Sequence, residues 1–181
     1  MPRYVALLRA INVGGHNVKM DYLRKLFEEL GFSEVETFIA SGNVIFASPE
    51  KDAAALEKKI EVYLRSALGY EVATFIRTTS EIAEVAEHKP FPNEDIEGSG
   101  YSLYVVFMGR ELGEEAKKKL IALNNPVDEF HVHGRELYWL CRKRMSESTI
   151  TGGVIEKAVG GMPGTNRNVT TVRKLAAKYH E

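Results

Sequence analysis

The residues best suited to chemistry lie together near the N-terminus, in residues 9–20. This segment follows an apolar run typical of a buried strand and precedes an amphipathic helical pattern, with a Gly14-Gly15 turn between them. The first backbone N–H groups of a helix lack acceptors within the helix, so a loop of this kind can bind an anion. The polar side chains of this loop are Arg9, Asn12, His16 and Asn17.

The same residues also allow purely structural interpretations. Glycine pairs are common in turns that need positive φ, and Asn17 has the side chain of a helix N-cap. At the end of a buried strand, Arg9 requires a partner, which is either an internal carboxylate or a bound anion. The segment therefore predicts a place for a ligand and no particular reaction.

A second polar turn, Ser41-Gly42-Asn43, is expected beside this loop. The first 78 residues show the pattern β-α-β-β-α-β of a ferredoxin-like module, whose four strands lie in the order 4-1-3-2. In that order, the loop after the first strand and the turn between the second and third strands share one end of the sheet. We therefore expect a polar rim formed by both segments.

A third polar segment covers residues 163–171. Asn168 or Asn166 is placed to cap the final helix, and Arg167 would then stand beside the positive N-terminus of that helix. We expect Arg167 and Asn168 to close the site from the second half of the chain. The alternative is a capping segment whose arginine is solvated or paired with a carboxylate.

The patterning predicts an α+β protein with two ferredoxin-like modules, over residues 1–78 and 79–181, and a C-terminal helix. Ser48, followed by Pro49, is the expected N-cap of a helix ending at Gly69, and Thr78 with Glu81 is spaced as a capping box. The second module is atypical, because no clear last strand is evident. The expected elements are strands over 3–10, 34–40, 44–47, 72–77, 101–108, 128–132 and 137–142, and helices over 20–30, 49–68, 79–88, 111–123, 147–159 and from 168 onward.

The composition narrows the class of protein. The chain has 181 residues, of which 44% are hydrophobic and 27% charged, with a formal net charge of −1. It shows neither a signal-peptide pattern nor an apolar run of membrane-spanning length, and Cys141 is its single cysteine, so we expect a cytoplasmic protein. Basic residues gather near the C-terminus without interleaved aromatic residues, so nucleic-acid binding is not expected.

Several well-defined sites are excluded by spacing. The glycine pair does not match a P-loop or a dinucleotide-binding fingerprint, and no zinc or EF-hand motif occurs. His131 and His133 lie two residues apart on one strand, but no third metal ligand is evident, and Cys141 is expected to be a buried, inert thiol. We therefore expect no metal and no cofactor.

The three polar segments together resemble the domain-of-unknown-function family 1697, a set of small, mostly bacterial proteins. The resemblance spans the chain and implies two ferredoxin-like halves and a cytoplasmic location, without an established activity. Val169 stands where the family usually carries an aromatic residue. The motifs that carry the resemblance are Arg9-x-Ile-Asn-Val-Gly-Gly-x-Asn17, Met20-x-x-Leu23, Gly31-Phe32, Ser41-Gly42-Asn43-Val44 and Thr165-x-Arg167-Asn168-x-x-Thr171-Val172-x-x-Leu175.

Binding of a small anionic or phosphate-containing ligand is the function that these patterns favour. One alternative is an enzyme acting on a phosphorylated or nucleotide-like substrate, with Arg9 and Arg167 stabilising charge and His16 as general acid–base. A second alternative is RNA or DNA binding, although the central strands lack the aromatic motifs of RNA-binding sheets. The ligand-binding residues expected are Arg9, Asn12, Gly14, Gly15, Asn17, Ser41, Gly42, Asn43, Arg167 and Asn168.

Overall fold

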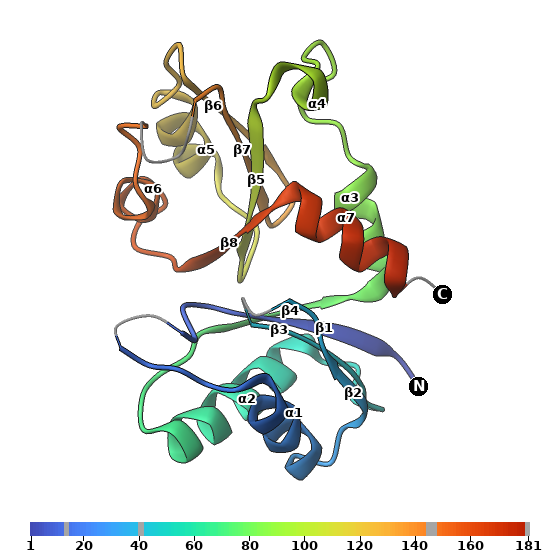
Figure 1. Cartoon of the computed structure of the whole chain (residues 1–181). Coiled ribbons are helices and arrows are strands. Elements are labelled where there is room, and N and C mark those ends of the chain that lie inside the picture. Colours follow the sequence, from blue (N-terminus) through green and yellow to red (C-terminus); the bar gives the residue numbers. More distant parts are fainter. Residues whose placement is uncertain (13–14, 40–41, 144–147, 180–181) are drawn as a thin grey trace. The chain divides into compact units, whose positions relative to one another are not determined.

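A computed structural model of the chain describes residues 1–12, 15–39, 42–143 and 148–179. The chain divides into two compact units, one comprising residues 1–84 with those from Leu175 onward, and the other residues 85–174. Each unit is built on one four-stranded antiparallel sheet (Figure 1), so the expected α+β class with two ferredoxin-like modules is confirmed. A module boundary after residue 78 stays a prediction.

The first sheet has the strand order β2-β3-β1-β4, as predicted. Helices α1 and α2 cover one face of it, and the helical spacing of Leu23, Leu26 and Phe27 places these side chains in the core below α1. The elements of this part are β1 (Arg3–Leu8), α1 (Met20–Glu29), β2 (Ser33–Thr37), β3 (Asn43–Ala47), α2 (Ala53–Leu68), β4 (Thr74–Thr78) and α3 (Thr79–Glu87).

The start of α2 differs from the prediction. Asp52, not Ser48, is the N-cap, and its carboxylate accepts hydrogen bonds from the N–H groups of Ala54 and Ala55. The Ser48 hydroxyl instead accepts the N–H of Glu50, forming a turn before the helix. Both residue types favour N-caps, so the sequence pattern alone did not separate them. The end of α2 at Gly69, with a φ of 85°, is as expected.

The second sheet has the order β6-β7-β5-β8, which repeats that of the first. The α5 and α6 side of this sheet holds its own apolar core, around Trp139, Leu137 and Leu120. The elements of this part are α4 (Ile96–Ser99), β5 (Ser102–Met108), α5 (Glu114–Ile121), β6 (Asp128–His133), β7 (Glu136–Cys141), α6 (Gly152–Ala158), β8 (Gly164–Asn168) and α7 (Val169–Lys178).

Strand β8 corrects the expectation that the second module lacks a clear last strand. It pairs with β5 through five consecutive residues of the polar segment Gly-Thr-Asn-Arg-Asn. The sequence did not reveal it because its buried positions are occupied by Thr165 and Arg167, not by apolar residues. The expected helix over 147–159 also begins later, at Gly152, where the Thr151 hydroxyl accepts the N–H of Val154; Glu147 lies outside the described residues.

Within the described ranges, no helix combines the length and the hydrophobicity needed to cross a membrane.

Gly42, directly before β3, is held tightly against the end of β1. The Leu8 N–H donates to the Gly42 carbonyl at 2.8 Å. Gly42 has a φ of 85°, and a Cβ atom placed there would lie 3.0 Å from Ile11 Cγ2 and 3.1 Å from Leu8 Cβ. Only glycine therefore satisfies both the backbone conformation and the close approach.

We expect Gly42→Ala to destabilise the fold more than Gly31→Ala. Both positions have positive φ, which costs an alanine about 1–2 kcal/mol, but only Gly42 has neighbours within 4 Å of an added Cβ. Crowding of Leu8 and Ile11 should add about 1–3 kcal/mol to the loss. Urea denaturation of the two variants measures this difference in free energy of unfolding. Equal losses would show that the contact at Gly42 relaxes without cost.

Candidate functional site

The two polar segments expected to share a rim do lie at one end of the first sheet. The bond from Leu8 to the Gly42 carbonyl and the closeness of Gly42 to Ile11 join the loop after β1 to the β2–β3 turn. Gly14 and Ser41, two of the predicted ligand-binding residues, lie outside the described residues. The predicted proximity of the two segments is therefore confirmed for the parts of both that the structure describes.

The asparagines at this rim bond to the backbone. Asn12 Oδ1 accepts the N–H of Val18 at 2.8 Å and so closes the loop between β1 and α1. Asn43 is completely buried, and its Nδ2 donates to the Phe38 carbonyl at 2.9 Å. This bond links the end of β3 to the residue that follows β2. We assign a structural role to both amides, because each one forms a hydrogen bond with a backbone group that lies outside the regular pairing of the sheet.

Arg9 lies directly after β1, as predicted. Its backbone N–H donates to the Ala73 carbonyl at 2.9 Å, which extends the pairing with the strand segment before β4 by one residue. The residue is half-buried. Whether its guanidinium contacts a ligand stays a prediction.

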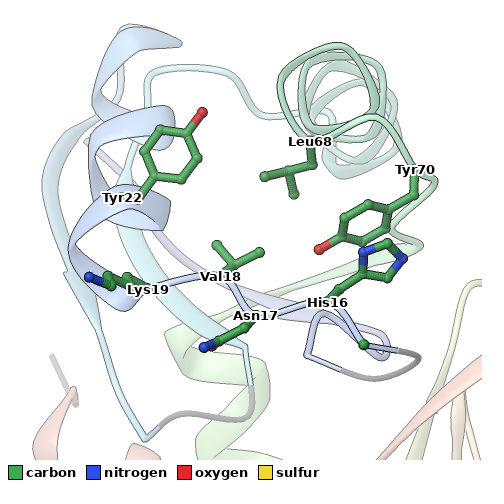
Figure 2. A pocket seen from close by; sticks show the side chains of 8 residues that line it. His16, Asn17, Val18, Lys19, Tyr22, Leu68 and Tyr70 are labelled. Carbon is green, nitrogen blue, oxygen red and sulfur yellow. The ribbon is translucent and has the colours of Figure 1, made fainter.

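A pocket of about 470 Å³ opens beside this rim, between the loop after β1, the start of α1 and the end of α2. Figure 2 shows Tyr22 on one side of the space and Tyr70 with His16 on the other, with Leu68 between them and Asn17 and Lys19 pointing outward. Gly15 and Asn17 are the residues of the predicted site that line it. The full lining is Gly15, His16, Asn17, Val18, Lys19, Tyr22, Leu68 and Tyr70.

Tyr70 fixes the loop wall of this pocket. Its hydroxyl donates to the Ile11 carbonyl at 3.0 Å, and its ring stacks on His16 with centroids 3.6 Å apart and planes 16° from parallel. Burial raises the pKa of the Tyr70 hydroxyl, so it remains a protonated donor at neutral pH. Together with the Asn12 bond, these contacts fix the described residues on either side of the Gly14-Gly15 turn.

The pocket borders the N-terminus of α1, because Val18, Lys19 and Tyr22 line it. Lys19 is the N-cap, with an extended backbone and no side-chain bond to the first turn. Among the described residues, no acceptor bonds to the N–H groups of Met20 and Asp21. These N–H groups and the Lys19 ammonium favour an anion, and the Asp21 carboxylate in the same turn reduces that preference.

The sequence patterns did not indicate the pocket walls formed by Tyr22, Leu68 and Tyr70. Leu68 and Tyr70 flank the end of α2, about fifty residues after the loop, and reach it only because α1 and α2 pack on the same face of the sheet. No local motif links Tyr70 to residues 9–20. The one available signal is Gly69, which ends α2. A glycine at this position predicts a turn that would bring Tyr70 back toward the end of the sheet.

Arg167 and Asn168 belong to β8 in the second unit. Arg167 is 6% exposed, and its Nη1 donates to the Thr165 hydroxyl at 2.8 Å and to the carbonyl of the preceding residue at 2.9 Å. Burial lowers the pKa of Arg167 to about 10. Asn168 caps α7 by accepting the Thr170 N–H at 2.8 Å, as expected. Closure of the first-unit site by these two residues stays a prediction.

Arg77 occupies the place in the first sheet that Arg167 occupies in the second. Arg77 pairs with Val5 of β1, and Arg167 pairs with Val105 of β5. Arg77 is only 1% exposed and donates from Nη1 to the carbonyl of the preceding residue at 3.0 Å, the same bond that Arg167 makes. The equivalence indicates that a buried arginine on the last strand belongs to the architecture of both modules.

The second unit holds a cluster of imidazoles. His88, which follows α3, stacks on His133 with ring centroids 4.2 Å apart, and His131 lies 5.5 Å from His88. The sequence spacing indicated only the pair His131 and His133. His88, which lies far from them in the sequence, was not expected beside them. The rings are nearly parallel, and no group of three or more potential ligands in the described part of the chain has metal-binding geometry. Cys141 is completely buried, as expected of an inert thiol.

This cluster favours neutral histidines. Burial lowers the pKa of His88, and His133 and His131 lower it further by repulsion between protonated rings. Burial and His133 lower the pKa of His131 in the same way. The Nε2 atom of His88 is buried and has no hydrogen-bond partner among the described residues, so a proton added there has no acceptor nearby.

We expect the protein to lose stability as the pH falls below about 6.5, and His88→Phe to reduce that loss. In the unfolded chain these histidines protonate near their ordinary pKa, whereas the folded cluster resists protonation, so the unfolded state is favoured on acidification. Phenylalanine keeps the ring stack and removes the titrating group. Denaturant unfolding between about pH 7.5 and about pH 5 measures the slope. An unchanged slope in His88→Phe would contradict the assignment.

The comparisons with known proteins fit this fold. A family model described as "Protein of unknown function (DUF1697)" matches residues 1–138. The structure of the conserved bacterial protein SP0830 from Streptococcus pneumoniae is similar, with a TM-score of 0.77 and 24% identity, over 100% of this chain and 99% of that chain. That likeness shows a shared fold alone, and the comparison with curated proteins gives no match. The chain therefore belongs to the DUF1697 family, as its motifs suggested.

Proposed function

We propose that this protein binds a small anionic, phosphate-containing molecule in the pocket at the start of α1. The observation that carries the proposal is that a pocket with aromatic walls is also lined by Lys19, the N-cap residue of α1, directly before first-turn N–H groups that have no acceptor among the described residues. Its volume, about 470 Å³, falls within the range of small-molecule sites.

The anionic part of the ligand would lie over the first turn of α1. The N–H groups of Met20 and Asp21 would donate to it, and the helix dipole adds a favourable field that is strongest at this end. Lys19 is exposed at the rim and has a long, flexible side chain that would reach an oxyanion there. This arrangement recognises charge without requiring a cofactor or a metal ion.

The rest of the ligand would lie between the two tyrosines. Tyr22 and Tyr70 stand on opposite sides of the space in Figure 2, and His16 extends the ring surface on the Tyr70 side. Aromatic faces bind flat or apolar groups by stacking and exclusion of water. A nucleoside monophosphate or a related ring-bearing phosphate therefore matches the pocket better than inorganic phosphate does.

The sequence-predicted residues enter this proposal in two roles. Gly15 and Asn17 line the pocket, while Asn12 and Asn43 hold the loops around it. Arg9 and Gly42 would extend the site toward the rim. We place the protein in the cytoplasm and include neither nucleic acid nor membrane among its partners.

A second candidate function is an enzyme acting on a phosphorylated or nucleotide-like substrate. His16 lines the pocket and is held by its stack on Tyr70, so an imidazole stands where general acid–base chemistry on a bound phosphate compound would need it. Loss of turnover in His16→Gln, with ligand binding retained, would favour this function over binding alone.

We expect Lys19→Gln to weaken binding of a nucleoside monophosphate roughly two- to fivefold, the usual effect of one charge at a helix terminus. Lys25→Gln is the matched control, because Lys25 is an exposed lysine of the same helix that does not line the pocket. Isothermal titration at low salt measures both affinities, with inorganic phosphate as a second probe.

The control also separates site-specific binding from general attraction to a positive surface. Equal weakening in Lys19→Gln and Lys25→Gln would contradict the pocket assignment, because it would reflect net charge alone. The absence of saturable binding for every phosphate compound tested would contradict the proposed function itself.

A further inference from the structure

A second pocket, of about 610 Å³, lies between Leu30, the C-cap residue of α1, and the exposed side of α2. We call it the α2 groove. It shares no residue with the pocket at the start of α1, and its volume also falls within the range of small-molecule sites. The residues that line it are Leu30, Ala55, Lys58, Lys59, Val62, Tyr63 and Ser66.

The walls of the α2 groove are mainly apolar. Val62 is 63% exposed, although it is a large hydrophobic residue. Leu30 and Tyr63 are half-buried and pack against the core of the first unit, so the apolar surface of the groove is continuous with that core. Along α2 the groove runs from Ala55 to Ser66, a rise of about 16 Å. A ligand with an apolar body would remove this surface from water.

The two lysines of the α2 groove have no carboxylate partner in the described part of the chain. No carboxylate oxygen there lies within 4.0 Å of the ammonium group of Lys58 or Lys59. The ammonium of Lys59 lies 5.4 Å from the centre of the Phe32 ring, a cation–π contact that adds no negative charge.

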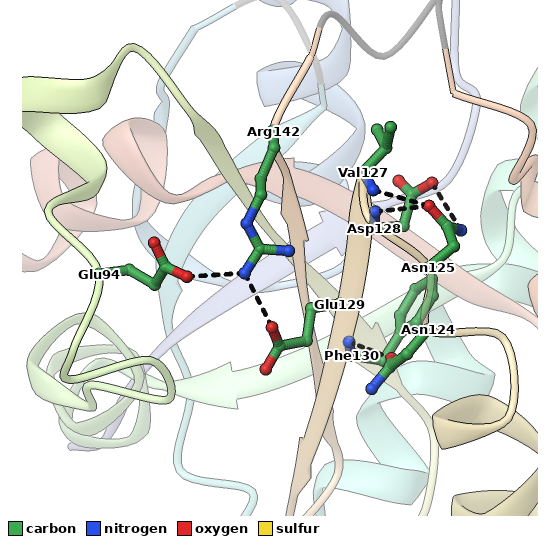
Figure 3. Close-up of polar contacts among 8 residues, drawn as sticks. All are labelled: Glu94, Asn124, Asn125, Val127, Asp128, Glu129, Phe130 and Arg142. Atoms are coloured by element: carbon green, nitrogen blue, oxygen red, sulfur yellow. Dashed lines mark hydrogen bonds and ion pairs between the residues drawn. The ribbon is translucent and has the colours of Figure 1, made fainter.

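Other basic side chains of this protein are paired. Arg142 donates to Glu94 at 2.7 Å and to Glu129 at 2.8 Å (Figure 3), and these hydrogen bonds raise the pKa of Arg142. Arg65, on the same helix as the groove lysines, lies 3.2 Å from the Glu71 carboxylate. The groove lysines therefore differ from these arginines, because an anion from outside the chain would be their first close partner.

The direction of the α2 carboxylates explains this difference. Glu57 and Glu61 are the acidic residues of α2, and both turn toward β4. Their carboxylates accept the backbone N–H groups of Ile76 at 2.8 Å and of Thr74 at 3.0 Å. The exposed side of α2 therefore carries the two groove lysines and no carboxylate of its own helix.

A negative charge beside Tyr63 would orient a ligand in the α2 groove. The Tyr63 hydroxyl donates to the Glu29 carboxylate, and this hydrogen bond raises the pKa of Tyr63. The charge of Glu29 disfavours a second anion close to Tyr63. The anionic end of a ligand would therefore lie at Lys58 and Lys59, with its apolar part along Val62.

We propose that the α2 groove binds an amphiphilic anion, a molecule with an apolar body and one anionic end. Opposite charge draws the anionic end to the two lysines, and the apolar walls bind the body. A simple anion would use the lysines alone, and a neutral apolar molecule would use the walls alone. The groove is narrow and about 16 Å long, so it fits a single dissolved molecule better than the surface of a membrane.

Binding of decanoate tests this proposal. Isothermal titration at low salt, with decanoate below its micelle-forming concentration, measures the affinity for the full chain. We expect saturable binding. Decylammonium has the same apolar body with the opposite charge, and acetate has the same charge without the body. Each should bind at least about tenfold more weakly than decanoate.

A matched pair of double variants tests the role of the charge. Lys58→Gln combined with Lys59→Gln should weaken decanoate binding roughly two- to tenfold. Lys25→Gln combined with Lys51→Gln removes the same charge from exposed lysines outside the groove, and it should leave the affinity unchanged. Equal weakening in the two double variants would overturn the proposal, because it would reflect net charge alone.

A second pair of variants tests the apolar wall. Val62→Asp places a charge in that wall and should weaken decanoate binding about tenfold or more. Ala67→Asp is the matched control, because Ala67 is an exposed residue of α2 outside the groove. An unchanged affinity in Val62→Asp, equal binding of decylammonium, or no saturable binding of decanoate would overturn the proposal. Cosedimentation with phosphatidylglycerol vesicles, without binding of dissolved decanoate, would overturn the choice of a dissolved ligand.

Discussion

The need of every backbone N–H group for an acceptor governs much of this structure. Sheets and helices satisfy most of these groups, and side chains satisfy many that remain: Glu57 and Glu61 at β4, and Asn12 in the loop after β1. At the start of α1, the described N–H groups of Met20 and Asp21 are left without such partners. We place the proposed ligand there.

The sequence predicted the order of elements well because apolar periodicity dominates it. The strand order of the first module and the capping box of Thr78 and Glu81 were both correct. The start of α2 and the presence of β8 were not predicted, for one reason. Both depend on polar residues: Asp52 as a cap and Thr165 with Arg167 as buried strand positions. Polar residues serve caps, turns and strands alike, so their spacing alone does not decide between these roles.

The proximity of the two polar loops was predicted from the sequence, whereas the walls of the pocket beside them were not. Topology alone brought the loop after β1 to the β2–β3 turn, because strand order fixes which loops share an end of the sheet. The pocket walls depend on side-chain packing between α1 and α2, which periodicity predicts only as contact between two faces. The only sequence signal for Tyr70 was therefore the indirect one of Gly69 before it, although the Tyr70 hydroxyl bonds to the Ile11 carbonyl.

The central claim is that an anion binds over the first turn of α1. Amide chemical shifts in a ¹H–¹⁵N NMR titration with a nucleoside monophosphate test it most directly, because the proposed donors are themselves the observed groups. The account predicts saturable shifts concentrated at residues 15–22 and at Tyr70. Saturable shifts confined to other parts of the chain, with these amides unmoved, would contradict it.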